Sequence, residues 1–174
     1  MKKVRLLSVA FLAWVAAVAI SCADPTNPAP RSPVVSGDLF GQLTQLTGLL
    51  QCTPLPYDSV TQTIGPEGGT INVGPHTFTV PAGALDTAVT ITAVTPPDTI
   101  NRVQFQPEGL VFNGYVILRM SYANCNLLGS LTPKRVAYVS PDLNILDYLP
   151  SNDNALTQTV RGKVLHFSEY AVAW

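Results

Sequence analysis

The chain has 174 residues with a formal net charge of −1 at pH 7, and only 12% of its residues are charged. It has no run of basic residues and therefore no electrostatic reason to bind a polyanion, so the sequence excludes nucleic acid as a partner. Its 15 prolines and 12 glycines, beside many threonines and valines, are typical of a turn-rich β-protein. The length allows one domain with an adequate core.

The first 21 residues predict an export signal. Its positive start is made by Lys2, Lys3 and Arg5. Residues 6–20 follow as an apolar run, shorter than the about 20 residues of a comfortable membrane span. The run ends at Ser21-Cys22, which resembles a bacterial lipobox, where the thiol receives diacylglycerol and the leader is cut before the cysteine. The alternative is an ordinary secretory signal with an incidental cysteine, and both versions export the domain.

Lipidation at Cys22 predicts a protein anchored to a membrane of the cell envelope, with its domain outside the cytoplasm. Each buried CH₂ of an acyl chain contributes about 0.8 kcal/mol, so two or three chains hold the protein firmly. Ala23 stands where some envelope systems read an aspartate as a retention signal, which favours the outer membrane. Loss of the leader would leave seven basic against 11 acidic residues, a formal charge of −4.

Residues 22–36 predict a tether between anchor and domain. This stretch is rich in proline, which removes backbone donors and favours the extended polyproline II conformation. Its prolines are Pro25, Pro28, Pro30 and Pro33. We expect the tether to hold the domain away from the bilayer.

Residues 37–52 predict a short amphipathic helix. The leucines with helical spacing are Leu39, Leu43, Leu46 and Leu50, and Ser36 or Asp38 is a candidate N-cap. The helix has two interpretations. It packs against the β-domain, or it lies on a membrane or a partner. Membrane-surface helices usually carry Lys or Arg on the polar face, and this segment has neither, which favours packing.

Residues 57–174 predict an antiparallel β-sandwich, because short segments with period-two alternation are separated by Gly- and Pro-rich turns. The expected strands are residues 60–64, 70–73, 76–80, 88–94, 102–106, 115–122, 135–140, 145–149, 158–161 and 163–174. The aromatic residues are expected in the core and at its edges. An exposed row of tyrosines would instead indicate a carbohydrate-binding face.

Two cysteines remain if Cys22 is lipidated. Cys52 and Cys125 are 73 residues apart, and a disulfide between them would contribute roughly 4 kcal/mol in the chain-entropy model. The alternative is two buried free thiols. A metal site is not expected, because the chain has only two histidines and no Cys-x-x-Cys or His-x-x-x-His spacing. Asp142, Asp147 and Asp153 lack the spacing of an EF-hand and are interpreted as solvated turn residues.

Three motifs occur in a recognisable order. Gly68-Gly69 is followed by VPAGAL at residues 80–85 and by PEGLVF at residues 107–112, ahead of the apolar residues 116–118. This order resembles the zonula-occludens/Unc-five (ZU-five) domain, a β-sandwich module of ankyrins and netrin receptors. The resemblance covers roughly residues 60–122. It implies an interaction and scaffolding domain without cofactors.

The resemblance also implies an alternative function, self-cleavage. A His-Phe-Ser triplet in the family member PIDD is a self-cleavage site, and it resembles His166-Phe167-Ser168. Carried over, Ser168 would attack the carbonyl of Phe167 with His166 as the base, which needs a strained peptide bond. Residues 163–174 alternate without interruption and predict one continuous strand with no strained turn. We therefore expect no enzyme activity.

The sequence thus predicts a lipid-anchored envelope protein whose β-sandwich is a non-catalytic interaction module. The alternatives are a self-cleaving domain and an extracellular polysaccharide-binding module. The partner is an unidentified protein or polysaccharide, and no cofactor is expected.

Overall fold

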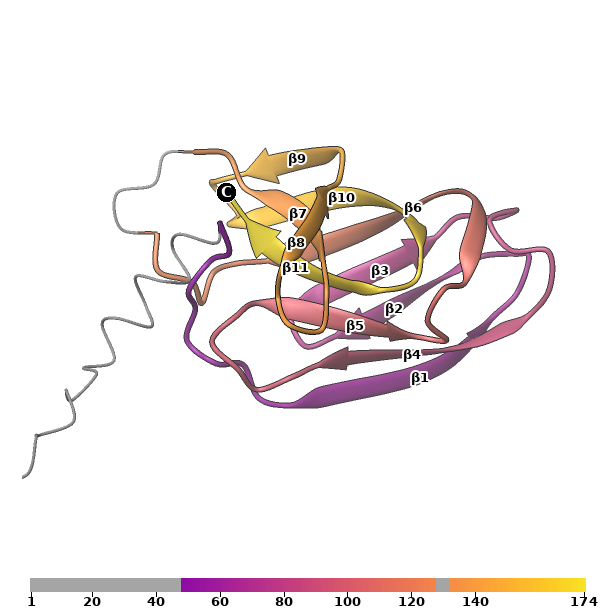
Figure 1. Ribbon diagram of the computed structural model, residues 1–174. Coiled ribbons are helices and arrows are strands. Elements are labelled where there is room, and N and C mark those ends of the chain that lie inside the picture. The colour runs from indigo at the N-terminus through magenta and orange to yellow at the C-terminus, as the bar shows by residue number, and fades with distance from the viewer. Residues whose placement is uncertain (1–47, 128–131) are drawn as a thin grey trace, which may run out of the picture. The chain divides into compact units, whose positions relative to one another are not determined.

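The computed structural model describes residues 48–127 and 132–174 of the chain (Figure 1). The predicted leader, Cys22, the tether and residues 37–47 of the predicted helix lie outside the described residues. The described part contains no helix that is long and apolar enough to cross a membrane.

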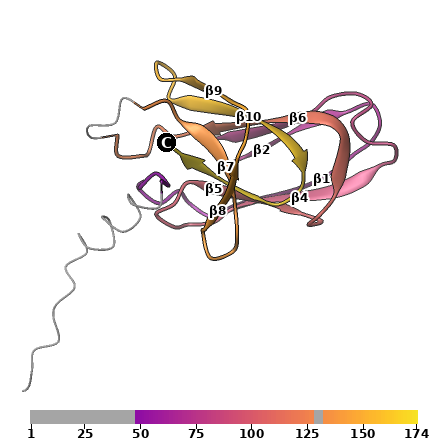
Figure 2. The same cartoon turned by 45° about the horizontal axis from the view of Figure 1, so that its top comes forward.

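The described residues form two antiparallel sheets that pack as a sandwich, which confirms the predicted all-β architecture. One sheet has six strands in the order β1-β4-β5-β11-β7-β8, and the other has five in the order β2-β3-β6-β10-β9. The strands are β1 (Asp58–Ile64), β2 (Gly69–Val73), β3 (His76–Val80), β4 (Val89–Thr95), β5 (Arg102–Gln106), β6 (Val111–Ser121), β7 (Arg135–Val139), β8 (Ile145–Tyr148), β9 (Ser151–Asn154), β10 (Thr159–His166) and β11 (Glu169–Ala173). Figure 2 shows β9, β10 and β6 in one layer and β4, β5 and β8 in the other.

Alternate side chains of each sheet meet in one core between the layers. Its centre is aromatic: the ring of Phe78 lies 4.5 Å from that of Phe105, and Phe167 stacks on Phe105 at 5.4 Å. Phe112 meets Phe167 edge-on at 5.0 Å. Such pairs contribute beyond the area they bury, so this cluster holds the two sheets together.

The last part of the chain differs from its prediction as one continuous strand. It breaks at Phe167 and Ser168, where β10 of the five-stranded sheet ends and β11 of the six-stranded sheet begins. The core residues around the break, Val164, Phe167 and Tyr170, are three apart. The predicted unbroken alternation is therefore interrupted here, and the sequence pattern alone did not reveal the change of sheet. A further strand, β9 (Ser151–Asn154), was not predicted, because Ser, Asn and Asp are typical of turns.

Residues 49–52 are extended, so the helix predicted for residues 37–52 is wrong at this end. Leu49 forms a bridge with Ala173, and the Leu50 amide donates to the Val172 carbonyl at 3.0 Å. Leu50 enters the main core, whereas Leu49 enters a second apolar cluster on the outer side of β11. Only an extended backbone sends two neighbouring side chains to opposite sides.

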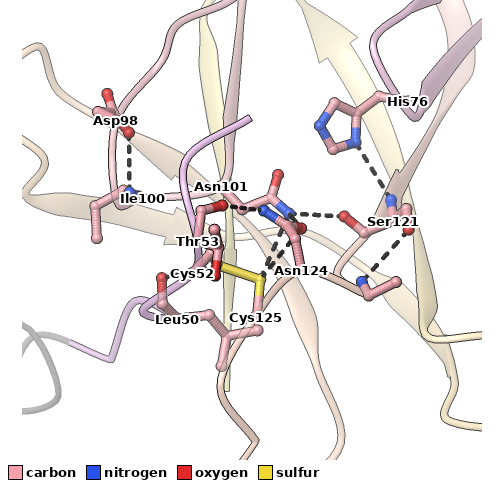
Figure 3. Close-up of a disulfide and its surroundings, with 11 residues drawn as sticks. Leu50, Cys52, Thr53, His76, Asp98, Ile100, Asn101, Ser121, Asn124 and Cys125 are labelled. Atoms are coloured by element: carbon pink, nitrogen blue, oxygen red, sulfur yellow. Dashed lines mark hydrogen bonds between the residues drawn. A yellow bond between two sulfur atoms is a disulfide. The ribbon is translucent and has the colours of Figure 1, made fainter. Parts of the chain in front are cut away.

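The predicted disulfide is present between Cys52 and Cys125 (Figure 3). The surrounding backbone is paired as well, since the Thr53 amide donates to the Asn124 carbonyl at 2.8 Å. The Asn101 side-chain amide donates to the Ser121 carbonyl at 2.7 Å. The disulfide therefore attaches the segment that enters the domain to the loop after β6.

Candidate binding surface

The sequence-predicted cleavage residues lie at the crossing between the sheets. Phe167 is 1% exposed, and its carbonyl accepts a hydrogen bond from the Gly109 amide at 3.1 Å. Its own amide donates to the Leu110 carbonyl at 2.7 Å. Ser168 is buried and contributes to the lining of a hollow of 260 Å³. The crossing is held by these backbone hydrogen bonds.

His166 approaches the Phe167 carbonyl but makes no hydrogen bond to Ser168 among the described residues. Its Nδ1 lies 3.5 Å from the Phe167 oxygen and 3.5 Å from the Tyr170 hydroxyl. That hydroxyl donates to the His166 carbonyl at 2.6 Å, and burial raises the pKa of Tyr170. A base needs hydrogen-bond reach to the hydroxyl it activates. This geometry ties the His166 ring to the turn, not to the Ser168 hydroxyl.

A different surface gathers charged side chains on the outer face of the five-stranded sheet. Arg161 of β10 stands directly opposite Arg119 of β6, and Lys163 stands opposite Ile117. The alternate residues of β10, Gly162 and Val164, are buried. The alternation therefore places both arginines and the lysine on the outer side. We call Arg119, Arg161 and Lys163 the basic stripe.

No carboxylate neutralises the basic stripe within residues 48–127 and 132–174. The ion pairs seen there, those of Arg102 with Asp98 and Glu169, involve none of its three residues. Like charges placed directly opposite on neighbouring strands are destabilising by roughly 0.2–1 kcal/mol. The pair of Arg119 and Arg161 therefore has an energetic cost, and no ion pair in the described part of the chain compensates it.

Two hollows adjoin the basic stripe. The larger, of 410 Å³, has Ile117 and Pro150 among its apolar lining residues, and Arg161 and Lys163 among its polar ones. The smaller, of 200 Å³, is lined by Arg119, Asn152, Asn154, Thr157, Thr159 and Arg161. Asn152 and Arg161 belong to both. Neither hollow has an Asp or a Glu in its lining, so both present positive charge and hydrogen-bonding groups.

Exposed apolar side chains lie at the other end of the same strands. Tyr115 is 50% exposed, and the Lys163 ammonium group lies 5.3 Å from the centre of its ring. Val111 and Leu165 are also exposed. Tyrosine and arginine are both enriched where proteins recognise partners. We call the basic stripe, the two hollows, Tyr115 and Leu165 the β6–β10 face.

Two buried residues fix the strands beneath this face. A Cβ added at Gly162 would lie 2.7 Å from the Cβ of Val136 in the other sheet, so only glycine permits this close approach. His76 accepts a hydrogen bond from the Ser121 amide at 3.2 Å. Burial, assisted by the charge of Arg119, lowers the pKa of His76 to about 4. His76 is therefore neutral at neutral pH and adds no charge beneath the face.

Sequence reasoning missed this surface because its residues are far apart in the chain. Arg119 and Arg161 are 42 residues apart, and only the pairing of β6 with β10 brings them together. The absence of a basic run holds for the sequence, but the folded domain has a basic cluster. The alternation of Arg161 and Lys163 around Gly162 was the available signal, and it needed a strand partner to be interpreted.

Asp147 and Asp153, interpreted from the sequence as solvated turn residues, lie instead in strands β8 and β9, and both accept hydrogen bonds. Asp153 accepts hydrogen bonds from the Tyr122 hydroxyl at 2.6 Å and from the Lys134 amide at 2.9 Å. Asp147 accepts one from the Tyr148 amide at 2.7 Å. Over residues 48–127 and 132–174, no three His, Cys, Asp or Glu side chains come together in a way that could hold a metal ion.

The fold thus defines a β-sandwich protein with a disulfide and a basic surface on one sheet. Compared with models of known protein families and with curated proteins, the chain matches none.

Proposed function

We propose that this protein is a lipid-anchored protein of the bacterial cell envelope whose β-sandwich is a non-catalytic interaction module of the ZU-five type. The anchor is the acylated Cys22, and the domain faces the space outside the cytoplasm, with the outer membrane favoured. The disulfide between Cys52 and Cys125 supports an oxidising compartment, because disulfides are rare in the cytosol.

The observation that carries this proposal is the unneutralised pair of Arg119 and Arg161 on the β6–β10 face. Residues that lower stability without any structural gain are typical of functional sites. An open sheet face with two shallow hollows suits the binding of a large partner. We assign the interaction to this face.

Photocrosslinking in the native envelope tests the assignment. A photoreactive phenylalanine analogue at position 115 lies on the β6–β10 face, and the same residue at position 61 lies on the outer face of the other sheet. We expect a crosslinked adduct from position 115 and none from position 61. Equal labelling from both positions, or none from position 115, would contradict the proposal.

The anchor has a separate test. Replacing Cys22 by serine removes the thiol that would be acylated, so we expect the protein to move from the membrane fraction to a soluble fraction. If the Cys22→Ser protein stays with the membrane, the lipid anchor is wrong.

Self-cleavage between Phe167 and Ser168 is the alternative function. The strand break at this bond and the hydrogen bond from the Gly109 amide to the Phe167 carbonyl favour it, since an oxyanion needs such a donor. Denaturing mass spectrometry of the purified protein distinguishes the two functions. Loss of residues 168–174 in the wild type and not in Ser168→Ala would establish cleavage, and an intact mass excludes it.

A further inference from the structure

The β6–β10 face has the chemistry of a binding site for an acidic polysaccharide. We propose that the occupant is a polysaccharide whose sugar units carry carboxylates, bound across the two hollows and the basic stripe. This inference rests on the proposed function, because it names the partner of the same face.

Charge complementarity is the first argument. The basic stripe contains three of the ten basic residues of a chain with a net charge of −1, and neither hollow has a carboxylate in its lining. Arginine donors form a planar fork that binds a carboxylate with two hydrogen bonds. Arg119 and Arg161, opposite each other, can hold one carboxylate between them or two on successive sugar units. Binding would relieve their mutual repulsion.

The lining of the hollows is the second argument. Ile117 and Pro150 give the larger hollow an apolar part, and Asn152, Arg161 and Lys163 supply polar groups beside it. A sugar ring has the matching pattern, with C–H groups on its faces and hydroxyls at its edge. The volume of 410 Å³ lies within the range of about 300–1,000 Å³ found for small-ligand sites. This hollow therefore fits one sugar unit.

Continuity between the hollows is the third argument. The smaller hollow shares Asn152 and Arg161 with the larger, so a chain that leaves one enters the other. Thr157 and Asn154 line this second hollow and supply hydrogen-bonding groups for sugar hydroxyls. Protein interfaces typically have an apolar core and a polar rim. The two residues shared by the hollows, Asn152 and Arg161, are polar, so the centre of this surface lacks the apolar core of a protein interface. This favours a polysaccharide over an acidic protein as the partner.

Binding of the full-length protein, in a neutral detergent, to oligogalacturonate tests the inference. The fully methyl-esterified oligomer keeps the sugar chain and removes its charge, and poly-glutamate keeps the charge and removes the sugar. We expect oligogalacturonate to bind at least about tenfold more tightly than either. With three cations engaged, its affinity should fall by about 20- to 40-fold between about 50 and 200 mM salt.

Matched variants locate the site. Arg161→Gln removes one charge from the β6–β10 face, whereas Arg135→Gln removes one charge from β7 of the other sheet. We expect Arg161→Gln and Asn152→Ala to weaken oligogalacturonate binding by about tenfold and Arg135→Gln to leave it unchanged. Thermal unfolding of each variant shows that the fold is retained.

Several outcomes would overturn the inference. They are equal binding of poly-glutamate, a DNA oligomer or anionic phosphatidylglycerol vesicles, binding of the esterified oligomer at equal strength, or equal losses in Arg161→Gln and Arg135→Gln. If oligogalacturonate does not bind while position 115 crosslinks a protein in the envelope, the inference fails and the proposed function stands. If position 115 also gives no adduct, both fail.

Discussion

The outer faces of the two sheets differ in how their polar side chains are satisfied. On the six-stranded sheet, neighbours pair: the Thr61 and Thr92 hydroxyls are 2.9 Å apart, and so are those of Thr63 and Thr90. Arg102 is held by Asp98 and Glu169. On the five-stranded sheet, Arg119 faces Arg161 without a carboxylate among the described residues. Uncharged side chains pair on this sheet too, since the Thr77 hydroxyl donates to the Asn72 side chain at 3.1 Å. The distinction therefore lies in the arginines, and the face with the unneutralised pair is the candidate for binding.

The two outer faces also differ in how far the chain covers them. Leu49, held by its bridge to Ala173, packs with Ile100 on the outer side of β11. The disulfide at Cys52 secures this covering segment. Tyr115 and Leu165 on the other face stay exposed. The six-stranded sheet therefore uses part of its outer face for stability.

The largest expected effect comes from removing the disulfide. In the double variant Cys52→Ser/Cys125→Ser, the unfolding free energy should fall by about 4 kcal/mol. The disulfide links residues 73 positions apart, and its loss raises the conformational entropy of the unfolded chain. Urea unfolding measures the loss. Hydrogen exchange should rise first at β11, where the covering segment is released. Cys22→Ser is the control, and an equal loss in that variant would contradict this account.

Acid should destabilise the domain through His76. Its folded pKa of about 4 lies below the ordinary 6.5, so the unfolded chain binds a proton that the folded chain does not. The contribution of His76 to the unfolding free energy is therefore fully present above about pH 6.5. It is lost as the pH falls toward 4, which lowers the unfolding free energy by about 3 kcal/mol. His76→Asn keeps an acceptor for the Ser121 amide and should flatten this part of the pH profile. An unchanged profile in urea unfolding would exclude His76 as the cause.

Loss of one arginine should affect the two sheets differently. Arg102→Gln leaves Glu169, which is 9% exposed, without its cationic partner and should lower the unfolding free energy by about 2 kcal/mol. Arg161→Gln removes an exposed and unneutralised charge and should change it by less than about 0.5 kcal/mol. Equal losses in thermal unfolding would remove the distinction between the faces.

The smallest expected effect is a gain in stability. Arg119→Gln removes the like-charge contact with Arg161 and should raise the unfolding free energy by a few tenths of a kcal/mol. The same variant should bind oligogalacturonate more weakly. A loss of stability in urea unfolding would indicate that Arg119 has a structural role.

The sequence predicted the sandwich well because local signals coincide with its strands. β3 (His76–Val80) and β5 (Arg102–Gln106) match the predicted bounds, since alternation and flanking turn residues agree there. The disulfide was predicted because two cysteines, Cys52 and Cys125, remain when Cys22 is assigned to lipidation. The crossing at Phe167–Ser168 and the extended Leu49–Leu50 pair were missed, because tertiary contacts determine both. The β6–β10 face was missed for the same reason, since its charges meet only through strand pairing.

Hydroxyl-radical footprinting tests the central claim, that the β6–β10 face is the occupied surface of the protein, most directly. Tyr115 and Leu165 on this face are 50% and 44% exposed, and Tyr57 and Leu146 elsewhere are 63% and 54% exposed. In the native envelope, compared with the purified full-length protein, we predict reduced oxidation at Tyr115 and Leu165 and unchanged oxidation at Tyr57 and Leu146. Equal protection of all four residues, or protection of Tyr57 and Leu146 alone, would contradict the account.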